Sequence, residues 1–186
     1  MKTAYLALAC TLSFLALGSP VNAQDEPART VSAVDRAGVE AALRGAGYDI
    51  EMITPEDGSR SGIHVISGDD SATVFFDDCQ EAVPDFCETL VLSTWWDRET
   101  PVSDEIVAAA NLNHKYVSVF RDNEGDPVMQ WAILTRREGI PATVFLNALI
   151  RFFDVAREFD AFAFEGDTAV DATAEVAVRR EGGGTG

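Results

Sequence analysis

The chain has 186 residues, with 14 Lys and Arg against 31 Asp and Glu and a formal net charge of −17 at pH 7. A surface this acidic repels phosphate backbones and anionic lipid headgroups. We therefore expect no nucleic-acid binding, which depends on clustered basic residues. Solubility alone accounts for the charge, with attraction to a basic partner or to divalent cations as the alternative.

The first 23 residues have the layout of a secretory signal peptide. Lys2 precedes an apolar run from Ala4 to Leu17, and the small-residue cleavage site follows at Val21–Ala23. The run is shorter than the roughly 20 residues that a membrane span needs. A lipoprotein box at Ala7–Cys10 fits less well, because the run continues past it. We expect cleavage near Ala23, no stable membrane span, and a periplasmic or secreted protein.

The first half of the remaining chain predicts one helix followed by four short strands. Residues 24–31 resemble a flexible leader, and Ser32 with Asp35 resembles a capping box for a helix over residues 33–45. Glycines at 45 and 47 predict the end of this helix. Alternating apolar and polar residues then predict half-buried strands over residues 48–52, 63–66, 73–76 and 88–95.

The second half predicts a helix, two strands and a longer helix. Ser103 precedes a helix over residues 104–114, and alternation predicts strands over 116–120 and 128–134, joined by a turn at 123–126. A helix over residues 141–162 carries one apolar face, formed by Phe145, Leu149, Phe152, Phe153, Ala156 and Phe159. Residues 165–186 have little to bury and are predicted to be a disordered tail.

This order of elements predicts the fold class. Strands outnumber helices and follow one another in hairpins, which favours an antiparallel sheet with one covered face. We predict a single α+β domain over residues 32–164, with a helix–strands–helix–strands–helix order.

Cys79 and Cys87 are predicted to form a disulfide. They are the two cysteines that remain after signal cleavage, in a compartment that is oxidising. A zinc site would need about four ligands and closer Cys spacing, and a redox pair is more often Cys-x-x-Cys. The bridge would close the loop between the third and fourth strands.

No catalytic motif is present in the sequence. The chain lacks Gly-x-Ser-x-Gly, His-Glu-x-x-His, a phosphate loop and a dinucleotide fingerprint. Its two histidines lie on a predicted strand (His64) and at a helix end (His114). We expect no enzyme activity, no catalytic residue and no cofactor. The alternative is an envelope enzyme that uses Asp77 and Asp78 as acid and base.

Three acidic clusters allow a calcium-binding alternative: Asp69–Asp70, Asp77–Asp78 and residues 122–126. The last cluster lacks the alternating Asp order and the closing Glu of a calcium loop. A hairpin turn explains it with fewer assumptions, so we expect no metal site.

Trp95, Trp96 and Trp131 are the candidate binding residues. Adjacent strand residues point to opposite faces, so one of Trp95 and Trp96 should face the core and the other should face outward, under the long helix or in a partner or ligand groove. Trp96 is our first choice for the outward ring. An outward aromatic ring on a sheet favours an interaction surface, although cover by another element of the same domain is the more frequent outcome.

Several short features recur along the predicted elements: Gly47–Tyr48, Thr73–Phe76 running to Cys79, Cys87 before Leu90, Asn111–Asn113, Tyr116, Asp122, Gly125 and the Phe-rich last helix. In these features and their order the chain resembles the YbjN family, described as candidate bacterial sensory-transduction regulators. Leu112 stands where the family often has an aromatic residue between two asparagines. We expect Asn111 and Asn113 to act as structural caps at a helix end.

The resemblance implies a fold similar to type III secretion chaperones. Those proteins are small, acidic, often dimeric, and bind other proteins without chemistry, although they are cytoplasmic and this chain is predicted to be exported. The signal peptide, the missing catalytic motifs and this resemblance together predict an exported, non-enzymatic protein-binding or regulatory domain with a protein partner, and a homodimer is compatible with them. An envelope enzyme, a calcium-binding protein and a structural envelope protein are the alternatives.

Overall fold

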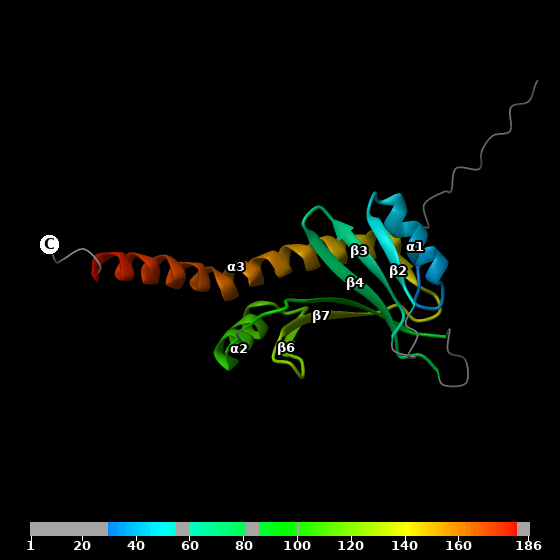
Figure 1. Ribbon diagram of the computed structural model, residues 1–186. Helices are drawn as coiled ribbons and strands as arrows, with labels where there is room; N and C mark the ends of the chain where they lie inside the picture. Colours follow the sequence, from blue (N-terminus) through cyan, green and yellow to red (C-terminus); the bar gives the residue numbers. More distant parts are fainter. Residues whose placement is uncertain (1–29, 55–59, 81–85, 100, 182–186) are drawn as a thin grey trace, which may run out of the picture.

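The computed structural model describes residues 30–54, 60–80, 86–99 and 101–181, with side chains described as far as Phe164. The predicted signal peptide, its cleavage site and most of the predicted leader lie outside these residues. The described elements follow the predicted helix–strands–helix–strands–helix order and form an α+β structure (Figure 1). The predicted fold class is confirmed.

Six antiparallel strands form the main sheet, in the order β2-β3-β4-β5-β7-β6. The first four strands pair in sequence order. The chain then passes through a helix, adds β6 at the far edge and returns with β7 beside β5. The strands are β2 (Asp49–Ile53), β3 (Gly62–Ser67), β4 (Asp70–Asp77), β5 (Thr89–Trp95), β6 (Ser118–Arg121) and β7 (Pro127–Leu134).

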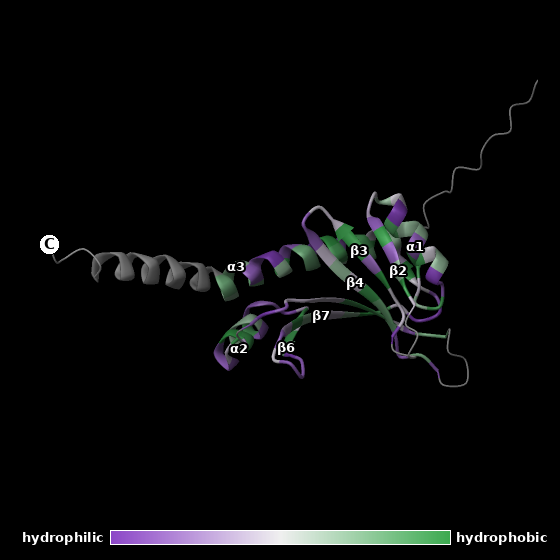
Figure 2. Ribbon diagram, in the orientation of Figure 1, coloured by the Kyte–Doolittle hydropathy of each residue, from purple (hydrophilic) through white to green (hydrophobic). Residues whose placement is uncertain are grey.

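The core lies between one face of this sheet and helix α3 (Ala142–Glu181), which runs along the sheet in Figure 1. The predicted apolar face of α3 is buried: Phe145, Leu149 and Phe152 are fully enclosed, and Phe153 and Phe159 nearly so. Opposite them lie the inward side chains of the strands, among them Val74, Leu90 and Leu92. In Figure 2 the apolar colour is concentrated on the strands and on the part of α3 beside them, whereas the β6–β7 turn is hydrophilic.

Helix α1 (Arg36–Gly45) begins three residues later than predicted. Asp35 is its N-cap and accepts a hydrogen bond from the Gly38 backbone N–H at 2.9 Å. Ser32 therefore does not form the predicted capping box; its hydroxyl donates to the Arg136 carbonyl, far along the chain. The predicted end is confirmed, because Gly47 adopts a left-handed φ of 87° that glycine tolerates well.

A second, two-stranded sheet was not predicted. It pairs β1 (Thr30–Val31) with β8 (Ile140–Pro141), so the last two residues of the predicted leader are ordered against the chain just before α3. The Thr135 side chain accepts a hydrogen bond from the Ala33 N–H at 2.9 Å. This contact ties the start of the domain to the end of β7.

Helix α2 (Asp104–Asn113) begins as predicted. Ser103 is its N-cap and accepts from the Ile106 N–H at 3.3 Å. Hydrogen bonds from its own backbone and from Ser103 lower the pKa of Glu105, in the first turn where the helix dipole favours a negative charge. The helix ends at Asn113, and β6 begins at Ser118 instead of residue 116, so Tyr116 lies in the connecting loop.

Asn111 clamps the end of α2 to the free edge of β6. Its amide donates to the Val107 and Val119 carbonyls, at 3.0 and 2.8 Å, and its side-chain oxygen accepts from the Val119 N–H at 2.8 Å. The contact with Val107 runs back along the helix, whose C-cap is His114, so the prediction that Asn111 and Asn113 cap the helix end is wrong. The two contacts with Val119 also satisfy a strand edge that could otherwise pair with another chain.

We expect Asn111→Ala to lower the free energy of unfolding by about 1–2 kcal/mol, because it leaves the Val119 N–H and carbonyl without these partners. Urea unfolding followed by circular dichroism measures this change. The matched control is Asn113→Ala, at an exposed position on the same helix turn, which should change stability by less than about 0.5 kcal/mol. Equal effects of the two substitutions would contradict the clamp.

Helix α3 begins one residue later than predicted, because Pro141 belongs to β8. It continues to Glu181, so the helix end predicted near residue 162 is wrong. The disordered tail over residues 165–186 stays a prediction, since the side chains beyond Phe164 lie outside those described.

The predicted disulfide joins Cys79 to Cys87. It closes the connection between β4 and β5, and next to it the Gln80 N–H donates to the Phe86 carbonyl at 3.0 Å. The bridge therefore holds together the ends of two neighbouring strands, as predicted.

Candidate binding surfaces

The three tryptophans lie in three different environments. Trp95 ends β5 and is 53% exposed. Trp96 packs under α3, with its ring 4.8 Å from that of Phe159 and 6.3 Å from that of Phe164. One of the pair faces the core, as predicted, but the choice of Trp96 as the outward ring is wrong, because alternation places Trp96 on the helix side. Trp131 lies on β7, on the core side, half-buried against Tyr116.

The face of the sheet opposite α3 carries exposed apolar side chains. Trp95, Phe120 and Leu134 are 53, 41 and 55% exposed. Phe120 and Trp95 are both in register with Val128, so these three side chains form one row across β6, β7 and β5. We call the surface formed by Trp95, Phe120, Val128, Ala132 and Leu134 the open sheet face.

Apolar and polar rows alternate across this side of the sheet. Between the Trp95 row and the row that joins Ala132, Val91 and Phe75 lies a polar row formed by Ser118, Gln130, Ser93, Thr73 and His64. Members of the polar row contact one another: Gln130 donates to Ser93 at 3.4 Å, and His64 lies 3.4 Å from the Thr73 hydroxyl. The polar groups are thus partly satisfied within the sheet, and the exposed side chains of Trp95, Phe120, Ala132 and Leu134 remain as contact surface.

An acidic cleft of about 330 Å³ lies between the β3–β4 turn, the end of β5 and α3. Its apolar wall includes Trp95, Trp96 and Phe153. Its polar wall includes Asp69, Asp70, Asp160 and Arg157. Arg157 pairs with Asp70 and Asp154, and the hydrogen bond and charge of Asp70 raise the pKa of the guanidinium.

A smaller cleft of about 200 Å³ lies between the α2–β6 loop, β7 and α3. Tyr116, 70% exposed, stacks on Trp131 with ring centroids 5.4 Å apart and an angle of 14° between the rings. His114, Lys115 and Arg151 stand around this aromatic pair. We call this site the Tyr116 cleft.

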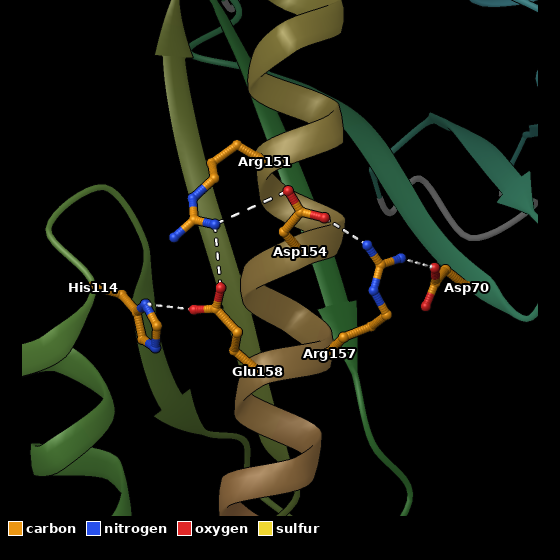
Figure 3. Close-up of polar contacts among 6 residues, drawn as sticks. All are labelled: Asp70, His114, Arg151, Asp154, Arg157 and Glu158. Atoms are coloured by element: carbon orange, nitrogen blue, oxygen red, sulfur yellow. Dashed lines mark hydrogen bonds and ion pairs between the residues drawn. The ribbon is translucent and has the colours of Figure 1, made fainter.

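A row of ion pairs crosses α3 between the two clefts (Figure 3). His114 lies 3.8 Å from Glu158, whose other oxygen lies 3.2 Å from Arg151. The row continues through Asp154 and Arg157 to Asp70 on the β3–β4 turn. Most of these side chains are half-exposed, so each pair contributes little stability by itself. Together the pairs hold Arg151 at the Tyr116 cleft and Arg157 at the acidic cleft.

The carboxylates proposed as an acid–base pair do not share a cleft. Asp77 pairs with Arg60 at 2.9 Å, and Asp78 accepts from the Thr89 hydroxyl. Neither lines either of the clefts described above. No observation of their geometry therefore supports catalysis by this pair.

The candidate calcium loop is a hairpin turn. The Asp122 carboxylate accepts from the Glu124 and Asp126 N–H groups at 2.9 and 3.0 Å, and Asp126 accepts from the Arg98 N–H. These carboxylates are therefore engaged by the backbone. Among the described residues, no three His, Cys, Asp or Glu side chains gather in a way that could hold a metal ion.

Within the described parts of the chain, no helix combines the length and the apolar composition that crossing a membrane requires.

Together the fold and these surfaces define an α+β protein with an antiparallel sheet, helix α3 packed on one face and exposed apolar side chains on the other. The family model of YbjN, described as "Putative bacterial sensory transduction regulator", matches residues 35–165. The chain belongs to the YbjN family. Comparison with curated proteins and with solved structures gives no significant match.

Lys115, Tyr116 and Arg151 were not among the predicted site residues. Tyr116 was assigned to a strand, and Arg151 was placed on the polar side of the last helix with no site attached to it. A cluster of His114, Lys115 and Tyr116 in three successive positions was the available signal. This cluster indicates a site only together with Trp131, which β7 places beside Tyr116.

Proposed function

We propose that this protein is an exported, non-enzymatic regulatory domain that binds a protein partner through the open sheet face. The observation that carries the proposal is the apolar row of Trp95, Val128 and Phe120, in which the two aromatic rings are exposed, together with the exposed Leu134 at the other end of β7. Exposed aromatic side chains of this kind are enriched at protein interfaces. The net charge of −17 favours a partner of net positive charge, since complementary charges speed encounter.

A regulatory role is supported by the family, whose description names a regulator of sensory transduction. Export rests on the sequence of residues 1–23. A chaperone-like mode of action, in which the partner is held without chemical change, agrees with a binding face made of side chains that have no reactive group. A homodimer through the same face is an alternative occupant, which the experiment below distinguishes.

The proposal is tested by site-specific photo-crosslinking in cells of the native host. A photoreactive phenylalanine analogue at position 120 should give a discrete adduct larger than the chain, and mass spectrometry identifies its second component. The same analogue at position 162, also exposed at 54% but on α3, is the matched control and should give no such adduct. An adduct of two copies of this chain would replace the partner by a homodimer. No adduct at position 120, or equal adducts at both positions, would contradict the proposal.

With the purified partner, Trp95→Ala should weaken binding by about 10- to 30-fold, because central interface aromatics often contribute 2 kcal/mol or more. Phe162→Ala removes a ring of similar exposure outside the face and should leave affinity within twofold. Isothermal titration calorimetry measures both, and unchanged thermal unfolding of each variant shows that the fold is intact. Equal affinity of Trp95→Ala and the unmodified chain would exclude this face.

A further inference from the structure

The Tyr116 cleft differs in charge from the rest of this acidic protein. The chain carries more than twice as many acidic as basic residues, yet none of the described residues that line this cleft is an Asp or a Glu. Lys115, Arg151 and His114 lie around it instead. The acidic cleft at the other end of the ion-pair row contains three aspartates. The described lining of the Tyr116 cleft thus includes two basic side chains, Lys115 and Arg151, and no carboxylate.

Two of these groups already bind a carboxylate of the protein itself. Glu158 spans from Arg151, at 3.2 Å, to His114, at 3.8 Å (Figure 3). The spacing of the two nitrogen-bearing side chains therefore suits a carboxylate. Lys115 is exposed and makes no ion pair with any described residue, so its ammonium group is available to a second anion.

The aromatic part of the cleft suits a planar group. Trp131 is half-buried and held by the sheet, whereas Tyr116 is 70% exposed and lies nearly parallel to it. Val117, 6% exposed, anchors the loop beside Tyr116, and the Asn111 clamp fixes the start of the same loop. The outer face of the Tyr116 ring is a preformed stacking surface, and stacked rings gain affinity beyond their buried area.

The volume limits the size of the ligand. At about 200 Å³, the cleft is smaller than the roughly 300–1,000 Å³ of pockets that hold drug-sized molecules. It has room for one ring and one short charged group, and not for a nucleotide.

We propose that the Tyr116 cleft binds an aromatic carboxylate, with the ring stacked on the outer face of Tyr116, beside Trp131, and the carboxylate directed to Lys115 and Arg151. The inference goes beyond the proposed function, because the cleft lies on the helix side of β7 and the open sheet face on the other. The same chemistry occurs in a free small molecule and in the C-terminal aromatic residue of a peptide, and the test separates these two sources.

The test titrates the chain without its first 23 residues, ¹⁵N-labelled, with N-acetylphenylalanine and follows the indole N–H signal of Trp131 by NMR, assigned with Trp131→Phe. The neutral amide of the same compound should bind at least about tenfold more weakly, because it lacks the charge that Lys115 and Arg151 meet. Tyr116→Ala should weaken binding of the acid about five- to tenfold, and Lys115→Gln about threefold. Arg44→Gln makes the same change in net charge on α1, outside the cleft, and should have no effect.

Several results would overturn the proposal: no shift of the Trp131 signal at millimolar acid, equal binding of acid and amide, or equal effects of Lys115→Gln and Arg44→Gln. A hexapeptide that ends in phenylalanine supplies the second arm. If the peptide binds more tightly than N-acetylphenylalanine and loses this gain on C-terminal amidation, the source is a protein C-terminus. If it binds no more tightly, the source is a free aromatic acid.

Discussion

Replacing Phe152 with alanine should lower the free energy of unfolding by about 3–5 kcal/mol, the range that large-to-small substitutions of buried aromatic residues produce. Phe152 lies in the middle of the described part of α3 and is fully buried against the sheet. Its removal leaves a cavity that the strands on one side and the helix on the other cannot close without moving apart. Urea denaturation followed by circular dichroism measures the change.

Phe162→Ala is the matched control for this prediction. Phe162 has the same side chain on the same helix but is 54% exposed, so its loss should cost less than about 1 kcal/mol. The difference between the two variants isolates burial from helix propensity. A cost at Phe152 as small as that at Phe162 would mean that α3 is not packed on the sheet as described.

The sequence predicted α3 and the first four strands because their patterns are local. Phe145, Leu149, Phe152 and Phe159 recur at the spacing of one helix face, and all are buried. Strands β2 to β5 alternate apolar and polar residues and pair with their neighbours in sequence. The disulfide followed from the same order, since a hairpin connection brings Cys79 and Cys87 together.

The binding surfaces could not be predicted in the same way, because they depend on one non-local pairing. Strand β7 lies between β5 and β6, and this insertion aligns Trp95 with Val128 and Phe120 in one row. It also places Trp131 behind Tyr116. No pattern within β7 specifies which strands pair with it. The sequence therefore predicted the tryptophans as binding residues but not the side chains that surround them.

The error at Trp96 and the error at Ser32 have a common physical origin. In each case a local pattern allowed two outcomes, and a distant contact selected one. The ring of Phe159 covers Trp96, and the carbonyl of Arg136 engages the Ser32 hydroxyl that would otherwise have been free to cap the helix. Asp35 caps the helix instead, in the absence of any competing tertiary partner among the described residues.

Reduction of the Cys79–Cys87 bridge should lower the free energy of unfolding by about 2–3 kcal/mol, since the disulfide closes a short loop and removes that much conformational freedom from the unfolded chain. Urea denaturation with and without a phosphine reductant measures the difference, and thiol counting without reductant should find no free thiol in the chain lacking residues 1–23.

The double variant Cys79→Ala with Cys87→Ala separates the effect of the bridge from the effect of side-chain packing. Cys87 is 3% exposed, so the variant should be somewhat less stable than the reduced chain and insensitive to reductant. Because the bridge joins the ends of β4 and β5, its loss should first increase hydrogen exchange at the Cys79 end of the sheet, while the amides of β6 and β7 beside the open sheet face keep their protection. A change of less than about 0.5 kcal/mol on reduction, or exchange that rises equally in all strands, would show that the bridge does not constrain this part of the fold.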